Sequence, residues 1–377
     1  MQYRTIGKTG IKLSILGFGC MRFPVLNKNE GRINQPEAEQ MLVEAIKNGV
    51  NYFDTAYTYH NETSEDFVGR FLKKGYRKDI YLATKLACWE VEKRSDMDRL
   101  LDEQLTRLKT DHIDFYLLHA LTKGRWENLI KNNVFDFIDR ILKDGRVSNI
   151  GFSFHDDLLV FKEITDAYNW DFCQIQYNFM DEEYQAGTEG LRYAADKGMG
   201  VIIMEPLRGG YLTNNLPEKI RNLWNSTGMK KSPAEMALQW VWNHPEVSVV
   251  LSGMSNLKQV IENCRTAEKI KPGSISNKEL GIIRKVRDEY LNRQLILCTG
   301  CNYCIPCPEG VNIPGIFSFY NEGKMYDNFS IARVRHSILV KEEERADKCV
   351  ECGECLEQCP QQIAIPDELK KCRDCFE

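Results

Sequence analysis

The sequence predicts a (β/α)8 barrel at residues 1–290, followed by a small, mainly helical domain at residues 291–377. Eight short runs rich in β-branched and aromatic residues alternate with longer amphipathic runs over about 250 residues, the usual length of such a barrel. Ten of the 14 cysteines lie after residue 297, and residues 294–377 carry 14 acidic against 9 basic side chains. A near-neutral α/β body is therefore expected to precede a separate, cysteine-rich domain.

The overall charge and hydropathy exclude some classes of protein. Lys and Arg number 50 against 54 Asp and Glu, a formal charge of −4, which gives no electrostatic basis for binding nucleic acid. No run approaches the roughly 18 apolar residues that would indicate a membrane span, and the first 13 residues contain no apolar signal region. We expect a soluble, cytoplasmic protein without nucleic-acid or membrane partners.

The expected strands are short apolar runs bounded by polar or turn residues. In order they are residues 15–19, 51–54, 80–84, 113–118, 149–151, 172–175, 201–204 and 247–251. A doubly wound sheet is the competing interpretation, but it requires a glycine-rich phosphate loop after the first strand. Gly17-Phe18-Gly19 lacks the third glycine and leads into no helix, which favours the barrel.

Helices are expected between these strands. They are residues 36–48, 65–74, 95–109, 126–143, 158–168, 189–197, 233–242 and 256–264. The first has Pro36 near its start and Gly49 after its end, both typical helix boundaries. Ser95 is the expected cap of the third helix, ahead of Asp96 and Asp98.

Polar residues follow three of the expected strands, where barrel enzymes place their active sites. Asp54 closes the second strand, Lys85 follows the third, and His119 follows the fourth, while Tyr59 comes five residues after Asp54. An ammonium group beside a phenol lowers the phenol pKa from about 10. A carboxylate would hold the ammonium and an imidazole would donate to the same oxygen, giving a proton donor for a carbonyl that receives hydride. Unrelated polar residues are the alternative, and spacing does not distinguish Tyr59 from Tyr57.

The segments that carry these residues resemble the tetrad motifs of the aldo-keto reductases. They are Asn51-Tyr52-Phe53-Asp54-Thr55-Ala56-Tyr57-Thr58-Tyr59, Ala83-Thr84-Lys85 and Asp114-Phe115-Tyr116-Leu117-Leu118-His119. The resemblance runs from Arg4 to about Asn263 and includes Thr5-Ile6-Gly7-Lys8-Thr9-Gly10, which in that family forms a hairpin closing the barrel bottom. It implies an oxidoreductase in which Tyr59 is the general acid, Lys85 and Asp54 tune it, and His119 orients the carbonyl.

The resemblance also implies a cofactor site that departs from the family pattern. The matching positions are Ser153, Gln174, Met204, Pro206, Leu207, Gly209, Gly253, Ser255, Gln259 and Asn263, for which backbone or core packing is the alternative. Gly19, Cys20, Met21 and Arg22 are added because they lie at the end of the first strand, where Arg22 is either a phosphate ligand or a solvated surface side chain. Phe154 replaces an amide ligand, Met204 stands where many members stack an aromatic ring on nicotinamide, and Gly253 and Gln259 replace bases used for the 2′-phosphate of NADP. The expected cofactor is NADH, NADPH or a flavin (FMN), with Arg22 available for a phosphate.

The tail contains two cysteine motifs. Cys298-x2-Cys301-x2-Cys304-x2-Cys307-Pro308 precedes Cys349-x2-Cys352-x2-Cys355-x3-Cys359-Pro360. The second has the bacterial [4Fe–4S] spacing, in which the fourth cysteine ligates the other cluster. We therefore predict one cluster on Cys298, Cys301, Cys304 and Cys359 and another on Cys349, Cys352, Cys355 and Cys307. Zinc held by four cysteines at each site is the alternative.

The whole tail resembles the C-terminal ferredoxin-like extension of an aldo-keto reductase subfamily. Helices are expected at residues 316–322 and 330–344. Cys372 and Cys375 are left over, either as a pair without ligand function, as alternative ligands or as a redox-active pair.

Three functions remain open from the sequence. The first is reduction of a carbonyl, or the reverse, coupled to electron transfer through two [4Fe–4S] clusters, for which a flavin could convert a hydride into single electrons. The second is an NAD(P)H-dependent reductase whose clusters are structural or dock a redox protein, and the third is a non-catalytic redox sensor. We expect a small carbonyl or alcohol substrate and, as a second partner, a redox protein. The loops around Trp89, Trp126 and Trp224 would shape the substrate pocket, although a core role for these tryptophans agrees equally well with the sequence. The sequence does not indicate the oligomeric state.

Overall fold

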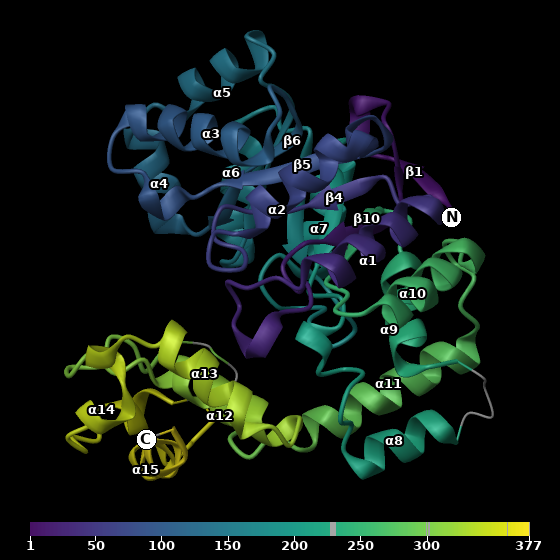
Figure 1. Cartoon of the computed structure of the whole chain (residues 1–377). Helices are drawn as coiled ribbons and strands as arrows, with labels where there is room; N and C mark the ends of the chain where they lie inside the picture. Colours follow the sequence, from purple (N-terminus) through teal and green to yellow (C-terminus); the bar gives the residue numbers. More distant parts are fainter. Residues whose placement is uncertain (227–230, 299, 301, 360, 377) are drawn as a thin grey trace. The chain divides into compact units, whose positions relative to one another are not determined.

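The computed structural model describes residues 1–226, 231–298, 300, 302–359 and 361–376. The chain divides into two compact units, shown in Figure 1. The first comprises Met1–Thr213 and Lys231–Leu280, and the second comprises Asn214–Lys230 and Gly281–Glu377. In the described ranges, no helix combines the length and apolar character needed to cross a membrane.

The first unit contains a closed barrel of eight parallel strands (Figure 1). Around the barrel the strand order is β10-β3-β4-β5-β6-β7-β8-β9, so each strand pairs with its neighbour in the chain and the last pairs with the first. The strands are β3 (Leu16–Gly19), β4 (Tyr52–Asp54), β5 (Tyr81–Leu86), β6 (Ile113–Leu121), β7 (Val147–Phe154), β8 (Phe172–Gln176), β9 (Gly200–Met204) and β10 (Val247–Ser252). The predicted barrel is confirmed, because an open doubly wound sheet would leave two edges unpaired.

Apolar side chains fill the barrel interior. The cluster contains Ile6, Leu13, Tyr52, Ala83, Phe115, Leu117, Phe172, Ile202, Val249 and Leu251. Ile6 and Leu13 come from the hairpin of β1 (Tyr3–Thr5) and β2 (Lys12–Ser14), which pair antiparallel as the family resemblance implies. A Cβ on Gly7 would overlap the backbone of Gly200, so the hairpin approaches the strands closely only because Gly7 has no side chain. A filled interior leaves the carboxyl ends of the strands as the place for chemistry.

Helices follow the strands largely as predicted. They are α1 (Gln35–Lys47), α2 (Ser64–Phe71), α3 (Arg94–Leu108), α4 (Lys123–Lys131), α5 (Val134–Lys143), α6 (Leu158–Ala167), α7 (Gly187–Asp196), α9 (Pro233–Trp242) and α10 (Leu257–Lys269). The single helix predicted at residues 126–143 is wrong, because Asn133 adopts a left-handed φ of 56° that separates α4 from α5. The cap predicted at Ser95 is also wrong: α3 begins at Arg94, and the Asp96 carboxylate accepts the backbone N–H of Lys93 at 3.0 Å.

The second unit is helical. It contains α8 (Glu218–Asn225), most of α11 (Asn277–Leu291), α12 (Ile313–Met325), α13 (Phe329–Leu339), α14 (Glu354–Gln358) and α15 (Ile365–Phe376). The helices predicted at residues 316–322 and 330–344 are present as α12 and α13 with different ends. Side-chain oxygens of Asn312 and Asn328 accept backbone N–H groups in the first turns of α12 and α13, which explains where both helices begin.

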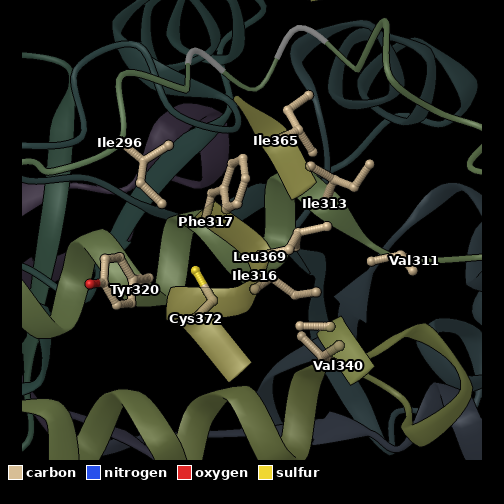
Figure 2. Packing of buried hydrophobic residues seen from close by; sticks show 11 residues of the cluster. Ile296, Val311, Ile313, Ile316, Phe317, Tyr320, Val340, Ile365, Leu369 and Cys372 are labelled. Atoms are coloured by element: carbon tan, nitrogen blue, oxygen red, sulfur yellow. The ribbon is translucent and has the colours of Figure 1, made fainter. Parts of the chain in front are cut away.

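A small hydrophobic core holds this unit together (Figure 2). It contains Ile296, Val311, Ile313, Ile316, Phe317, Tyr320, Val340, Ala346, Ile365, Leu369 and Cys372. In the part of the chain that the structure describes, seven cysteines, including members of both motifs, pack against it: Cys298, Cys304, Cys307, Cys349, Cys355, Cys359 and Cys375. Burial raises the pKa of Cys372 to about 12, so this thiol stays protonated and behaves as an apolar core side chain.

Candidate functional site

A buried ion pair lies at the carboxyl end of β4 and β5. The Lys85 Nζ atom donates to Asp54 Oδ1 at 2.6 Å and to the Thr55 carbonyl at 2.7 Å. Side-chain exposure is 0% for Lys85 and 2% for Asp54. Burial lowers the pKa of Lys85, but Asp54 and Tyr59 more than offset it and the net pKa is raised. Lys85 is therefore an ammonium ion at neutral pH.

Tyr59 lies against this ammonium group. Its hydroxyl oxygen is 3.3 Å from Lys85 Nζ, which lies 4.8 Å from the centre of the phenol ring. The sequence predicts that the ammonium lowers the phenol pKa, and Lys85 does act in that direction. Burial outweighs it, helped by Asp54, so the net pKa of Tyr59 is raised. Tyr59 is thus a protonated phenol at neutral pH, which is the form of a general acid.

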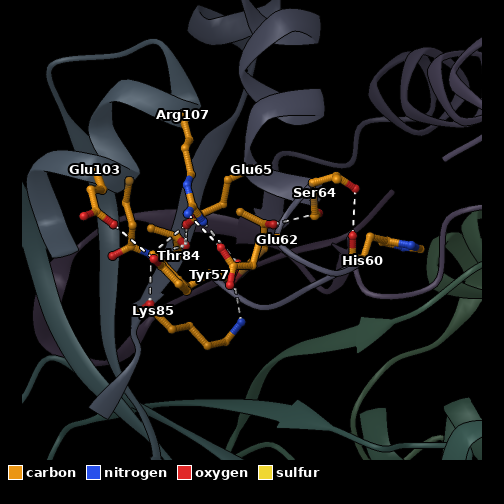
Figure 3. A network of polar contacts seen from close by, with 12 residues as sticks. Tyr57, His60, Glu62, Ser64, Glu65, Thr84, Lys85, Glu103 and Arg107 are labelled. Atoms are coloured by element: carbon orange, nitrogen blue, oxygen red, sulfur yellow. Dashed lines mark hydrogen bonds and ion pairs between the residues drawn. The ribbon is translucent and has the colours of Figure 1, made fainter. Parts of the chain in front are cut away.

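Tyr57 occupies a different environment, shown in Figure 3. Its hydroxyl donates to Glu103 Oε2 at 3.0 Å, and the guanidinium carbon of Arg107 lies 4.1 Å from the centre of its ring. Both partners come from α3. Of the two tyrosines, Tyr59 is the one whose hydroxyl receives a hydrogen bond from Lys85.

His119 completes the predicted tetrad at the end of β6. Its ring centre lies 6.2 Å from that of Tyr59, in an edge-on arrangement. Burial lowers the pKa of His119 well below its usual value, and the charges of Lys85, His155 and Arg125 lower it further. Its Nδ1 atom is buried and has no hydrogen-bond partner among the described residues. A neutral imidazole with its proton on Nε2 fits this environment and can donate one hydrogen bond.

A second polar network fixes the backbone behind Lys85 (Figure 3). The buried Glu65 carboxylate accepts from Thr84 Oγ1 at 2.6 Å and from Gln104 Nε2 at 2.7 Å. Gln104 Nε2 also donates to the Lys85 carbonyl at 2.9 Å. The sequence analysis missed these residues. Glu65 lies on the buried face of α2 among apolar residues. An acidic residue at an otherwise apolar position of the predicted helix was the feature of the sequence that could have indicated this network.

Three predicted cofactor residues meet at the ends of β7, β8 and β9. Ser153 and Gln174 are register partners, and Gln174 Nε2 contacts Met204 Sδ at 3.6 Å. Ser153 Oγ accepts the Ala120 backbone N–H at 2.7 Å. Gln174 Oε1 is buried without a hydrogen-bond partner among the described residues. Such an orphaned acceptor fits a cofactor that presents an amide or ring N–H.

Arg22 lies across two glycines of the predicted phosphate region. A Cβ on Gly209 would be 3.2 Å from Arg22 Nη2, and one on Gly253 would be 3.1 Å from Arg22 Cγ. Arg22 and Met21 are exposed, whereas Cys20 is buried and its pKa is raised by that burial. In the described part of the chain Arg22 forms no ion pair with a protein carboxylate. A guanidinium group over exposed glycine backbone fits a phosphate.

The remaining predicted cofactor residues lie at the ends of β3 and β9 or between the start and the middle of α10. Gly19 ends β3, and the buried Pro206 and the half-buried Leu207 follow β9. Gln259 Oε1 accepts from Ser255 N at 2.8 Å, and Asn263 Nδ2 donates to Ser252 Oγ at 3.1 Å. Gln259 is thus engaged in a local turn and offers no charge to a 2′-phosphate.

The three tryptophans expected around the substrate lie in different places. Trp89 is 38% exposed and its ring centre is 5.1 Å from that of His119. Trp126 is 3% exposed and packs against Phe135 and Trp170, which is the core role that the sequence left open. Trp224 belongs to the second unit.

The cysteine motifs line two adjoining cavities in the second unit. A cavity of about 540 Å³ is lined by Cys304, Cys307, Cys349, Cys352 and Cys355. A smaller one is lined by Cys298, Cys304 and Cys359, and Ile313 contributes to both. Cys301 lies outside the described residues. No three His, Cys, Asp or Glu side chains in the described ranges form a site for a single metal ion. The thiol donors around each cavity have the chemistry that a [4Fe–4S] cluster requires.

The chain belongs to the aldo/keto reductase family, whose model matches residues 15–287. A model described as a 4Fe-4S dicluster domain matches residues 297–364. The recognition of both families from the sequence motifs is confirmed, as is the assignment to the oxidoreductases.

Known proteins resemble the barrel at low identity. L-galactose dehydrogenase of Arabidopsis thaliana is 25% identical over 315 residues, covering 78% of this chain and 96% of its own. L-glyceraldehyde 3-phosphate reductase of Escherichia coli K12 is 25% identical over 340 residues, covering 78% and 94%. The holo form of aldo-keto reductase AKR11C1 from Bacillus halodurans superposes with a TM-score of 0.63 at 27% identity, covering 76% of this chain and 96% of its own.

We predict that Lys85→Met lowers the free energy of unfolding by about 3–5 kcal/mol, because it leaves the Asp54 carboxylate buried without its counter-charge. The double variant Lys85→Met with Asp54→Asn removes both charges and should recover part of that loss. Urea unfolding of the barrel measures both values. Equal losses in the single and double variants would contradict the importance of the ion pair.

Proposed function

We propose that the barrel reduces an aldehyde or ketone, or oxidises the corresponding alcohol, with Tyr59 as the proton donor. The observation that carries this proposal is the contact of the Tyr59 hydroxyl with Lys85 Nζ at 3.3 Å, beside the buried pair with Asp54. Relatives named as a dehydrogenase and a reductase support oxidoreductase chemistry at this site.

The proposed mechanism assigns one role to each polar group. The substrate oxygen lies between the Tyr59 hydroxyl and His119 Nε2, and both donate hydrogen bonds to it. As hydride reaches the carbonyl carbon, negative charge grows on that oxygen and Tyr59 transfers its proton there. The phenolate that remains is stabilised by the Lys85 ammonium group, which Asp54 and the Thr55 carbonyl hold in place. In the reverse direction the phenolate accepts the proton of the alcohol.

We further propose that NAD(P)H or FMN binds at the barrel end, held by Arg22, Ser153, Gln174 and the backbone at Gly209 and Gly253. Either cofactor supplies the hydride when bound. The orphaned Gln174 Oε1 atom and the position of Arg22 over the two glycines support this site. Met204 would pack against the cofactor ring, and Ser255, Gln259 and Asn263 would contact a more distant part.

For the domain at residues 291–377 we propose two [4Fe–4S] clusters, with the ligand sets predicted from the motifs. The shared lining of the two cavities by Cys304 and Ile313 supports clusters close enough to exchange electrons. Such clusters would exchange electrons singly with the barrel cofactor or with a redox protein. Clustered cysteine ligands suit a reducing compartment such as the cytoplasm.

A second candidate is an NAD(P)H-dependent reductase whose clusters are structural. The observation that favours it is that six motif cysteines among the described residues pack against the core of the second unit: Cys298, Cys304, Cys307, Cys349, Cys355 and Cys359. In that case the clusters would serve mainly to hold this small core together.

We predict that Tyr59→Phe lowers the rate of carbonyl reduction by at least about 10²–10⁴, the usual contribution of a positioned acid. The substitution removes the proton donor and almost no volume. Tyr57→Phe is the matched control and should retain activity, because its hydroxyl contacts Glu103. Steady-state kinetics with an aldehyde measures both, and loss in Tyr57→Phe with retention in Tyr59→Phe would reverse the assignment.

For the clusters we predict about eight iron and eight acid-labile sulfide per chain in protein prepared anaerobically, the content of two cubanes. Cys352→Ser should remove about half of each, whereas Cys264→Ser, in the barrel helix α10, should remove none. Colorimetric iron and sulfide assays give the values. Stoichiometric zinc without sulfide would identify zinc sites built from the same cysteines instead.

We predict that the anaerobic protein releases a flavin on denaturation, because coupling a hydride to single-electron centres needs a cofactor that splits electron pairs. Absorption spectra of the extract identify it, and rapid mixing with NADH should then bleach the clusters only in flavin-loaded protein. Protein that lacks flavin, binds NADH and reduces a ketone equally well after both clusters are destroyed would support the structural role of the clusters.

A further inference from the structure

Arg125 lies beside the tetrad on the first turn of α4, directly after β6. Its Nη1 atom donates to the Ala120 carbonyl at 2.7 Å, and its guanidinium carbon lies 5.2 Å from the centre of the Trp89 ring. The side chain is half-buried. In the described ranges it forms no ion pair with any protein carboxylate.

The same arginine is connected to the catalytic histidine in two ways. Ala120, whose carbonyl it binds, directly follows His119 in the chain. Trp89, on which it stacks, has its ring centre 5.1 Å from that of His119. The charge of Arg125 also contributes to the lowered pKa of His119, after burial, Lys85 and His155, which agrees with a guanidinium group close to the imidazole.

The backbone that positions Arg125 is strained. Ala120 has a φ of 53°, in the left-handed region that residues with a Cβ rarely adopt. Both of its backbone polar groups are engaged, since the N–H donates to Ser153 Oγ at 2.7 Å and the carbonyl accepts from Arg125. Such strain persists where surrounding contacts maintain it, and it concentrates at functional sites.

A purely structural stack on Trp89 is the simpler explanation of Arg125. Cation–π pairs at exposed positions are common and weak, about 0.5–1 kcal/mol. That explanation gives no role to most of the N–H donors of the guanidinium group. The group carries five of them, in a planar fork that matches the geometry of a carboxylate or a phosphate. It also gives no reason for an unneutralised cation and a strained peptide at the end of the strand that carries His119.

We propose that Arg125, together with Trp89, binds an anionic group of the substrate. The substrate class is then an aldehyde or ketone that bears a carboxylate or a phosphate. The carbonyl lies at Tyr59 and His119, the oxyanion pairs with Arg125, and the atoms between them pack on the exposed part of the Trp89 ring. This inference rests on the proposed carbonyl chemistry of the tetrad.

The test compares substrates that differ only in charge. They are 4-carboxybenzaldehyde, its neutral methyl ester and 4-formylphenyl phosphate, so the two anions separate carboxylate from phosphate recognition. Arg125→Gln should lower kcat/KM by about 10–100-fold for one or both anionic aldehydes, the usual value of a charge-assisted hydrogen bond. The loss for the methyl ester should be at least fivefold smaller. Lys123→Gln makes the same charge change on an exposed side chain two residues away, and should change all three values less than twofold.

A binding measurement keeps this inference separate from the catalytic proposal. Isothermal titration calorimetry with benzoate, phenyl phosphate and neutral benzamide requires no turnover. Arg125→Gln should weaken binding of at least one anion about 10-fold or more, and Arg125→Lys should restore part of it, since the charge returns without the planar fork. If the native protein reduces no aldehyde, the tetrad proposal fails while calorimetry still decides the role of Arg125. Equal anion binding by the native protein and Arg125→Gln, or equal losses for charged and neutral aldehydes, would overturn the inference.

Discussion

The buried ion pair of Lys85 and Asp54 is the interaction on which the rest of the candidate active site depends. Removing two charges from water costs desolvation free energy. The attraction between the charges offsets that cost only when their geometry is good and further hydrogen bonds are present. Here the Thr55 carbonyl accepts a second hydrogen bond from Lys85 Nζ, and Gln104 holds the Lys85 backbone from behind. These contacts hold the Lys85 ammonium group in one position beside the Tyr59 hydroxyl. A lysine side chain without them would be mobile and surrounded by water.

Most of the tetrad could be predicted from the sequence because its residues lie at the ends of strands. Asp54, Lys85 and His119 each come at the end of an apolar run, and the carboxyl ends of parallel strands in a closed barrel meet at one place. Tyr59 lies on a loop, so spacing left it equivalent to Tyr57. What separates them is Glu103, which lies on α3 and engages the Tyr57 hydroxyl from 46 positions away in the chain. That contact exists only in the folded protein.

Other features depended on long-range packing in the same way. Asn133 interrupts a continuous amphipathic pattern by adopting a left-handed conformation, which periodicity does not reveal. The sequence allows Trp126 a place at the substrate pocket or in the core, and only the folded chain brings it against Phe135 and Trp170. The cysteine motifs could be recognised in the sequence because short spacers bring their thiols together locally. The hydrophobic core against which they pack combines residues from distant parts of the chain, such as Ile296, Phe317 and Leu369. The raised pKa of Tyr59 likewise reflects burial that no local pattern encodes.

The raised pKa of Tyr59 is consistent with its proposed work as an acid. A phenol that resists ionisation keeps its proton through the binding of substrate and cofactor, so the acid is present in the correct form at neutral pH. The Lys85 ammonium group stabilises Tyr59 only as the phenol becomes a phenolate. That happens when the substrate oxygen, having gained negative charge, takes the proton from Tyr59. Burial and the ammonium group therefore act on different stages: the first preserves the proton before hydride arrives, and the second lowers the cost of giving it up afterwards.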